Sequence, residues 1–215
     1  MSLNLTPEKA LIFRITHIAN VPWLLDHGLH CPSSETRDPT FRLIGNLDLI
    51  AKRVNRVVPV APGGELSDYI PFYFTPCSPM LLNIKTGYQG VDQLPMSEIV
   101  ILVSSLHRVT EHGATFVFTD RHAYLQAATA SFSSRLEDLA RLDWPNLRAR
   151  DFRRSPDDPG KIERYQAEAL IHRHLPVSAL LGLACHGTAQ REALEVQLAQ
   201  RGLALKVVAQ PGWYP

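Results

Sequence analysis

The chain has 215 residues, of which 45% are hydrophobic and 20% are charged, and its formal net charge is +1. These values are ordinary for a soluble globular protein. The balanced charge excludes a uniformly basic surface, so any site for nucleic acid would have to be local. A chain of this length can bury one full core, and we expect a single domain over residues 1–215.

The cysteines and the apolar segments set two further limits. Cys31, Cys77 and Cys185 lie far apart without paired spacing, which predicts neither a disulfide framework nor a zinc site. We therefore expect a cytoplasmic protein without a bound metal. No stretch approaches the roughly 18 apolar residues of a membrane helix, so we expect no membrane span.

The first predicted elements are a strand and two helices. The β-branched and aromatic segment Leu11–His17 predicts a strand. The next helix is expected to begin at Asn20, which would cap it, and to stop at Gly28. The segment Asn46–Val58 has apolar residues at helical spacing. Its predicted apolar stripe consists of Leu47, Ile50, Val54 and Val57.

The middle of the chain predicts three strands. Tyr69–Leu81 has the pattern of a strand, a break and then a loop. Its prolines confine it to a sheet edge or to short strands. Glu98–Ser105 is the clearest buried strand, and Thr115–Asp120 is expected to be the next one.

The last third mixes helices and short strands. Ser133–Trp144 predicts an amphipathic helix capped by Ser133 or Ser134, and a charged loop is expected over residues 148–164. Ala189–Gly202 predicts a helix that ends at its glycine. Later strands are expected at YQAEALI, LLGLACH and ALKVVAQ. Because regular βαβ alternation is missing, the fold class is predicted to be α+β, and neither a G-x-G-x-x-G motif nor a P-loop occurs.

The carboxylate in the stretch Lys161–Leu170, which predicts the start of a strand, is the first candidate for chemistry. Residues two apart share a strand face, so Gln166 and Glu168 are expected to project together. They form either a solvated face or part of a cleft in which Glu168 stabilises positive charge developing on a ribose ring. One carboxylate suffices where the leaving group needs no proton, as when nicotinamide leaves NAD.

Basic and imidazole side chains give further candidates. In the first strand, Arg14 and Thr16 share one face, while His17 belongs to the other. His17 is either a satisfied histidine at a strand end or a contact for nicotinamide or ribose. On the second predicted helix, Arg53 and Arg56 lie three residues apart and therefore on one side. They form either a solvated face or a site for a pyrophosphate or a nucleic-acid backbone.

Two more groups stand beside predicted strands. The cluster that contains His122 directly follows the strand Thr115–Asp120. It forms either a turn capped by Asp120 or the wall of a site. Tyr73 and its aromatic neighbours either fill the core or stack on nucleobases.

Several long blocks of the sequence occur together in one known family. They are FRITHIANVPWLLDHGL, RVNRVVP, GGELSDYIPFYFTPCSPML, FVFTDRHA and YQAEALI. In this order and spacing, from about Ile12 to the terminal WYP, the chain resembles the DarT-type DNA ADP-ribosyltransferases. The blocks DYIPFYFTPCSPML and FTDRH are long enough to make coincidence improbable.

The resemblance implies a fold, a reaction and a biological role. The implied fold is ADP-ribosyltransferase-like, with a central mixed or antiparallel sheet flanked by helices. NAD is the implied donor, as a co-substrate, and the implied acceptor is a base of single-stranded DNA, typically thymine in a short sequence context. The resemblance also implies a toxin that is opposed by a macrodomain antitoxin of the DarG type.

Individual roles are implied in the same way. Glu168 matches the catalytic glutamate, and Arg53 matches the arginine that assists proton removal from the base. Contacts with NAD are implied for Arg14, Ile15, Thr16, His17, Asn20, Gly28 and Arg53. Contacts with DNA are implied for Arg56, Tyr73, His122, Arg154 and Gln166. Some relatives have histidine at the position of Arg14, so the contact implied there is one of the backbone.

Alternatives stay open at this point. The acceptor could be guanine, RNA or protein, or the chain could only hydrolyse NAD. A non-catalytic nucleic-acid module would use the basic stretch Arg148–Lys161, although the balanced net charge argues against it. Arg56 is an alternative to Arg53 as the assisting arginine. Because a guanidinium stays protonated in proteins, either arginine would act electrostatically.

Overall fold

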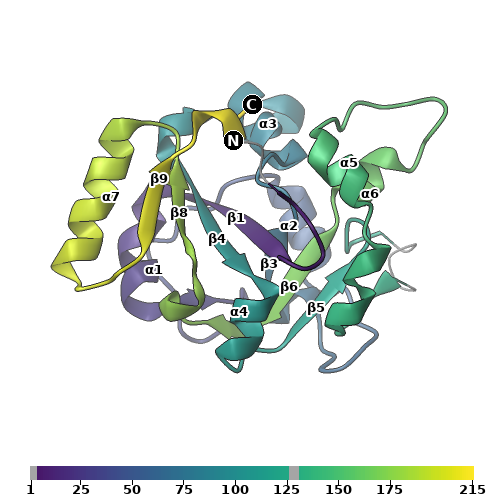
Figure 1. The fold of residues 1–215 in the computed structure, drawn as a ribbon, viewed down its shortest axis with the longest axis horizontal. Helices are drawn as coiled ribbons and strands as arrows, with labels where there is room; N and C mark the ends of the chain where they lie inside the picture. Colours follow the sequence, from purple (N-terminus) through teal and green to yellow (C-terminus); the bar gives the residue numbers. More distant parts are fainter. Residues whose placement is uncertain (1–3, 126–130) are drawn as a thin grey trace.

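In the computed structural model, which describes residues 4–125 and 131–215, a sheet of seven strands forms the centre (Figure 1). The strand order is β5-β6-β3-β1-β4-β8-β9. The strands are β1 (Leu11–His17), β3 (Tyr69–Tyr73), β4 (Ile99–Ser105), β5 (Phe116–Thr119), β6 (Glu168–His172), β8 (Gly182–Cys185) and β9 (Lys206–Ala209). Neighbours run antiparallel except β8 and β9, so the expected mixed sheet is confirmed. A separate small sheet pairs β2 (Leu29–His30) with β7 (His174–Leu175).

Helices flank this sheet on several sides. They are α1 (Val21–His27), α2 (Leu47–Arg53), α3 (Pro79–Thr86), α4 (Leu106–Glu111), α5 (Trp144–Ala149), α6 (Lys161–Tyr165) and α7 (Thr188–Gln200). Helix α7 contacts β8 and β9 at one end of the sheet, whereas α5 and α6 lie together toward the end formed by β5 and β6 (Figure 1). The predicted α+β class is therefore confirmed.

The N-terminal predictions agree with the structure at their ends. Strand β1 has the expected bounds, and α1 stops directly before Gly28. The φ angle of Gly28 is +80°, and a Cβ atom there would lie 2.6 Å from His174 Nε2 and 2.7 Å from the Leu175 carbonyl oxygen. The positive φ and the close approach of β7 both require glycine at this position.

Strand β3 lies inside the sheet. Because it contains a proline, we had expected either a strand at the edge of the sheet or a short strand. The strand is indeed short, with five residues. Its ladder with β6 runs along the whole strand, whereas its ladder with β1 is registered only at Phe13 and Tyr73. Pro71 is therefore tolerated because the sheet is incompletely paired on its β1 side, where Arg14 Nη1 donates a hydrogen bond to the Pro71 carbonyl oxygen at 2.8 Å.

Two helix predictions were wrong in position. A helix forms at α3, where a loop was expected, because the Ser78 side chain accepts a hydrogen bond from the Leu81 N–H. The helix expected over Ser133–Trp144 is replaced by a 3₁₀ segment, Leu136–Arg141, followed by α5. The reason is local pairing: Ser133 forms a β-bridge with Phe118, and its hydroxyl donates to Asp138 at 2.6 Å.

Two further corrections concern the segments that carry the candidate residues. Residues Lys161–Tyr165 form α6, and β6 begins only at Glu168, so Gln166 and Glu168 do not share a strand face. Helix α2 ends at Arg53 instead of Val58. Its predicted apolar stripe does not face the core, since the members Leu47, Ile50, Val54 and Val57 are 59%, 37%, 40% and 63% exposed.

Candidate active site

A cavity of about 520 Å³ lies between β1, β3, α1, α2 and the loop of residues 31–46. It brings together most of the residues that the sequence singled out. Those that line it are Arg14, Ile15, Thr16, Asn20, Gly28, Arg53, Tyr73, His122 and Glu168. These residues come from segments far apart in the chain, so the fold assembles them in one concave site, as ligand sites usually are.

The carboxylate of Glu168 lies at the start of β6 and is 1% exposed. The Arg53 guanidinium donates to both of its oxygens, from Nη1 to Oε1 at 2.9 Å and from Nη2 to Oε2 at 2.6 Å. The N–H of Ala123 also donates to Oε1, at 3.0 Å. A two-pronged arginine contact of this kind fixes both the position and the orientation of a carboxylate.

Electrostatics keep this pair charged. Burial alone would raise the pKa of Glu168, but the charge of Arg53 and the hydrogen bonds from Arg53 and Ala123 outweigh it, so the pKa lies below its ordinary value. Burial also opposes the charged form of Arg53, but Glu168 outweighs burial, so the pKa of Arg53 lies above its ordinary value. The carboxylate is therefore ionised at neutral pH although it is almost completely shielded from water.

The imidazole of His122 lies beside this pair and is buried. Its Nδ1 accepts a hydrogen bond from the Tyr124 N–H at 3.2 Å and lies 3.4 Å from Glu168 Oε1. Burial lowers the pKa of His122 most strongly. Glu168 raises this pKa by less, and Arg53 lowers it slightly further. The ring is therefore neutral at pH 7, and because Nδ1 accepts, its proton belongs on Nε2.

Arg14 and Tyr73 form the wall opposite to α2. Burial lowers the pKa of Arg14 to about 10, an effect that Tyr73 opposes and Arg53 strengthens. Burial raises the pKa of Tyr73 to about 12, together with the charge of Glu168. Because Glu168 neutralises Arg53, the charges of Arg14, Arg53 and Glu168 together leave one net positive charge in the cavity, which favours an anionic ligand.

Asn20 lines the cavity, but the polar atoms of its side chain form hydrogen bonds within the protein. Its Nδ2 donates to Thr16 Oγ1 at 3.1 Å and to the Arg42 carbonyl oxygen at 2.9 Å, and its Oδ1 accepts from the Arg42 N–H at 2.8 Å. The expected helix-capping bond is not made, because the amide is committed elsewhere. We call this set of bonds the Asn20–Arg42 clamp.

Outside the lining of this cavity lie four predicted site residues: His17, Arg56, Arg154 and Gln166. His17 faces away from it, with Nε2 3.0 Å from Glu98 Oε2 and Nδ1 accepting from the Ala19 N–H. Arg56 donates to the Leu125 carbonyl oxygen at 3.3 Å. Arg154 is exposed on the segment between α5 and α6. The geometry therefore favours Arg53 over Arg56 as the arginine next to the carboxylate.

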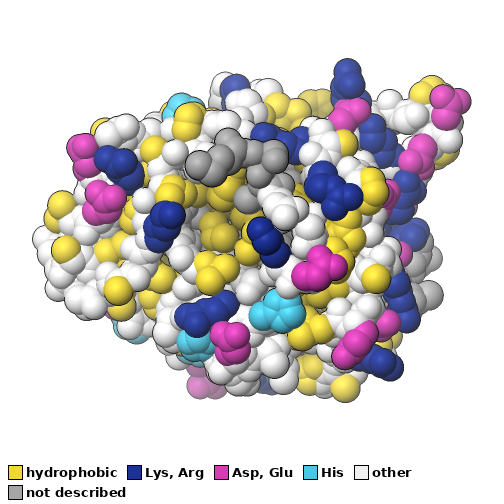
Figure 2. Space-filling view, viewed as in Figure 1, with side chains coloured by type: hydrophobic (Ala, Val, Ile, Leu, Met, Phe, Trp, Pro, Cys, Tyr) yellow, Lys and Arg dark blue, Asp and Glu magenta, His cyan; other side chains and the backbone are white. Residues whose placement is uncertain are grey.

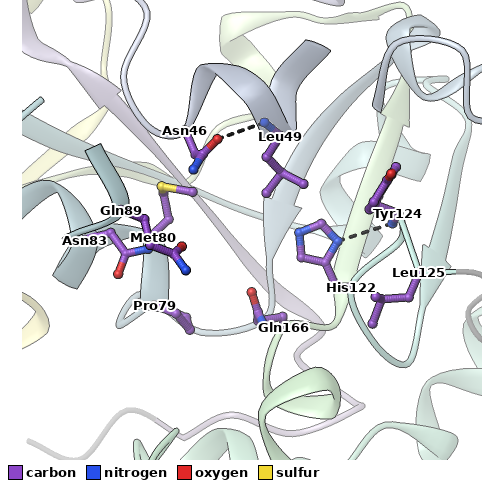
Figure 3. A pocket seen from close by; sticks show the side chains of 10 residues that line it. All are labelled: Asn46, Leu49, Pro79, Met80, Asn83, Gln89, His122, Tyr124, Leu125 and Gln166. Atoms are coloured by element: carbon purple, nitrogen blue, oxygen red, sulfur yellow. Dashed lines mark hydrogen bonds between the residues drawn. The ribbon is translucent and has the colours of Figure 1, made fainter. Parts of the chain in front are cut away.

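A second, smaller cavity of about 200 Å³ adjoins the first and has His122 as one of its walls (Figure 3). Gln166, the last predicted DNA contact, lines this cavity and not the first one. Its other polar walls include the amides of Asn46, Asn83 and Gln89. His122 lines both cavities, together with Asn46, Leu49 and Met80, so the two cavities adjoin each other.

Sequence reasoning missed Arg42, Asn83 and Gln89. The partners of the Asn20–Arg42 clamp are 22 positions apart and belong to a turn and an irregular loop, so no periodicity could have joined them. Asn83 was hidden by the loop expected in place of α3. Gln89 has a positive φ of +56°. Residues other than glycine rarely adopt this conformation, and no pattern in the sequence predicts it here.

Among residues 4–125 and 131–215, no group of three or more His, Cys, Asp or Glu side chains is placed to hold a metal ion. Within the same part of the chain, no helix combines the length and apolar character that crossing a bilayer requires.

Residues 13–215 match the model of a family described as "ssDNA thymidine ADP-ribosyltransferase, DarT". A DNA ADP-ribosyl transferase of Escherichia coli O127:H6 (strain E2348/69 / EPEC) is 52% identical over 213 residues, which are 99% of this chain and 97% of that protein. A protein of the same description from Thermus sp. (strain 2.9) is 38% identical over 193 residues, with 88% and 87% coverage.

Two solved structures are similar along almost the whole chain. The complex of Thermus sp. 2.9 DarT with ADP-ribosylated ssDNA has a TM-score of 0.88 and 33% identity and covers 100% of both chains. The complex of the same Thermus protein with NAD+ has a TM-score of 0.80 and 35% identity and covers 97% of this chain and 99% of that one.

Proposed function

This chain belongs to the DarT family of single-stranded-DNA thymidine ADP-ribosyltransferases, and we propose how its own residues move ADP-ribose from NAD to DNA. As a member it is an NAD-dependent DNA ADP-ribosyltransferase with NAD as co-substrate. One observation carries the assignment of residues: an ionised carboxylate, Glu168, is held by Arg53 at the wall of a dinucleotide-sized cavity.

The residues of the first cavity fit NAD. Arg14 and Arg53 outweigh the single negative charge of Glu168, and the positive charge that remains favours an anionic dinucleotide. Strand β1 has no registered partner on β3 from Arg14 to Thr16, so its backbone on that side is open to the carboxamide of nicotinamide. We assign this stretch to the nicotinamide end of the cavity, next to Glu168.

Glu168 is assigned to stabilising the ribose as it becomes positive. A carboxylate has about four lone-pair positions. Two on Oε1 accept from Arg53 and Ala123, and one on Oε2 accepts from Arg53. The remaining position on Oε2 accepts a hydroxyl of the nicotinamide ribose. Its negative charge acts in a shielded site while the bond between C1′ and the nicotinamide nitrogen breaks, with the electron pair leaving on neutral nicotinamide.

Arg53 is assigned to the acceptor side of the reaction. The new bond joins C1′ to ring nitrogen N3 of thymine, and N3 loses its proton to water. A guanidinium cannot accept that proton, so Arg53 lowers the energy of the negative charge developing on the base. A single strand suits this step because a duplex would have to release the base first, at a cost of a few kcal/mol.

We further propose that the protein acts as a toxin in the cytoplasm and that a macrodomain antitoxin of the DarG type removes the mark. The three cysteines Cys31, Cys77 and Cys185 are free and buried, which agrees with a reducing compartment. The partner proposal rests on the family. Its test is to add such a macrodomain to a modified oligonucleotide: we expect the added mass to disappear, and a stable adduct would contradict the proposal.

The acceptor is tested by competition. Thymine-containing single-stranded DNA, the same sequence as a duplex, a guanine-only DNA, RNA and a carrier protein are incubated together with NAD and the enzyme. We expect mass spectrometry to show one added ADP-ribose on the thymine-containing single strand only. Modification of guanine, RNA or protein instead would overturn the acceptor, and nicotinamide release without any adduct would reduce the activity to NAD hydrolysis.

A further inference from the structure

The second cavity has its own chemistry, different from that of the first. Arg53 and Glu168 do not line it, and within the described residues no lysine or arginine does. Its polar residues are those with side-chain amides, His122 and Tyr124, and its apolar walls include Leu49 and Met80. An uncharged polar and apolar site of this kind does not suit a phosphate group, but it suits the flat, neutral ring of a nucleobase.

Two of the amides are available for a ligand. Within the part of the chain that the structure describes, the side chains of Asn83 and Gln89 have no hydrogen-bond partner. Gln166 donates one N–H to the Ile162 carbonyl oxygen at 3.2 Å and keeps its oxygen free. An amide offers a donor and an acceptor side by side, which matches the edge of an unpaired base.

The backbone conformation of Gln89 also supports a ligand site in the second cavity. Its backbone has φ +56°, a conformation that costs a glutamine energy and that glycine would adopt freely. The two neighbouring turn positions, Gly87 and Gly90, are glycines with positive φ. Gln89 keeps a long polar side chain at this strained position, beside Asn83 and Met80 (Figure 3).

We propose that the second cavity binds the base of a nucleotide adjacent to the acceptor and that Asn83 and Gln89 read the edge of this base. The inference rests on the proposed function, since it needs a DNA strand at Glu168. The acceptor base must reach the ribose carbon in the first cavity. The second cavity adjoins the first, because Asn46, Leu49, Met80 and His122 line both, so a nucleotide next to the acceptor in an unstacked strand can reach it.

The test uses a pool of short single strands with one thymine and randomised bases on both sides, together with NAD. Sequencing or mass spectrometry of the modified fraction gives the preference at each flanking position. The variants are Asn83→Ala, which favours the helix α3, and Gln89→Gly, which removes the side chain and relaxes the backbone. The matched control is Gln200→Ala, which removes an exposed amide on α7.

We expect the wild type and Gln200→Ala to share a preference at one flanking position. Asn83→Ala and Gln89→Gly are expected to weaken this preference about tenfold, the size of one lost base-edge contact. Nicotinamide release in the absence of DNA should not change. If a variant loses turnover, fluorescence anisotropy with the preferred and the disfavoured oligonucleotide supplies the same comparison.

The inference is overturned if the wild type has no flanking preference or if both variants keep the full preference of the wild type. Failure of the proposed function looks different: the wild type would then consume NAD and leave every oligonucleotide of the pool unmodified.

Discussion

Glu168 is a carboxylate on which burial and charge act in opposite directions. Burial favours its neutral form, whereas the charge of Arg53 and the hydrogen bonds from Arg53 and the Ala123 amide favour the ionised form and prevail. Charges interact more strongly in such a shielded place than in water. The ability of Glu168 to stabilise a positive ribose therefore depends on Arg53, in addition to any contact that Arg53 makes with the acceptor.

Replacing Arg53 should move the activity of the enzyme to higher pH. In Arg53→Gln the strongest charge that holds Glu168 ionised is gone, so burial raises the pKa of the carboxyl. We expect the rate of nicotinamide release to increase with pH across the neutral range in this variant. The wild type and Arg53→Lys, which keep a cation, should show no such increase. Identical pH profiles for Arg53→Gln and the wild type would disprove the electrostatic link.

His122 should make the stability of the protein fall in mild acid. Its pKa is lowered by burial in the folded state, whereas in the unfolded chain it is about 6.5. As the pH falls below about 6.5, the unfolded chain binds a proton that the folded protein does not, so the free energy of unfolding decreases until the pH passes below the folded pKa. The decrease attributable to one proton is at most about 1.4 kcal/mol per pH unit.

The comparison for His122 is with His122→Gln, whose side chain does not titrate. We expect denaturant unfolding to show a steeper loss of stability between pH 7 and pH 5 for the wild type than for the variant. All other titrating groups are common to both proteins and cancel. A parallel decrease in the two proteins would show that His122 is not buried in its neutral form.

At the scale of elements, the wall of the first cavity is an irregular loop, residues 31–46, and irregular segments need fixed points. Between Thr36 and Gly45, the described hydrogen bonds that join this loop to the rest of the fold all involve Arg42. The Asn20–Arg42 clamp holds the backbone of Arg42, and Nη1 of the Arg42 side chain lies 3.5 Å from Glu98 Oε2. Arg42 therefore supplies the hydrogen bonds that fix this part of the loop against the cavity, where Ile44 adds an apolar contact with the core.

Removing the clamp should weaken NAD binding more than the chemical step. In Asn20→Ala three hydrogen bonds are lost, each contributing about 1 kcal/mol. We expect the KM for NAD to rise about tenfold while kcat changes less than twofold. Asn20→Asp keeps the acceptor for the Arg42 N–H and should lie in between. Asn4→Ala removes an exposed amide and serves as the control. A fall in kcat at constant KM would contradict the clamp as a positioning device.

Elements with a strong local signal could be predicted from the sequence. The bounds of β1 were correct, and β4 and α7 were misplaced by one residue at their starts, because buried strands and capped helices have patterns of their own. The 133–144 helix failed because Ser133 pairs with β5, and the α2 stripe failed because this helix lies at the rim of the cavity with its apolar residues exposed. Both outcomes depend on tertiary contacts that no local window contains.

The candidate site was predictable only in part for the same reason. Glu168 and Arg53 were chosen from motifs and a family resemblance, but their pairing joins positions 115 apart. The reasoning that led to Glu168, a shared strand face with Gln166, was wrong. Helix α6 ends directly before Gln166, β6 begins only at Glu168, and the two residues line different cavities. The roles of the individual residues stay predictions.

At the scale of the whole molecule, the charge is balanced and dispersed. Figure 2 shows Lys and Arg side chains scattered among acidic and apolar ones on one face, with more of them toward the side of α5 and α6. Many of the cations in this region are paired with nearby acidic residues, as Arg153 and Lys161 are with Asp151. On this face the described cations form no broad basic surface, so we expect the molecule to recognise its substrate mainly through its cavities.

The central claim is that the ionised carboxylate of Glu168 drives transfer of ADP-ribose from NAD to a base of single-stranded DNA. The most direct measurement follows one turnover on a short thymine-containing strand by mass spectrometry, for the wild type and for Glu168→Gln, with NAD affinity measured in parallel. We predict one added ADP-ribose with the wild type and a rate at least about 100-fold lower with the variant, at nearly unchanged affinity. Transfer by Glu168→Gln at the rate of the wild type would contradict the account.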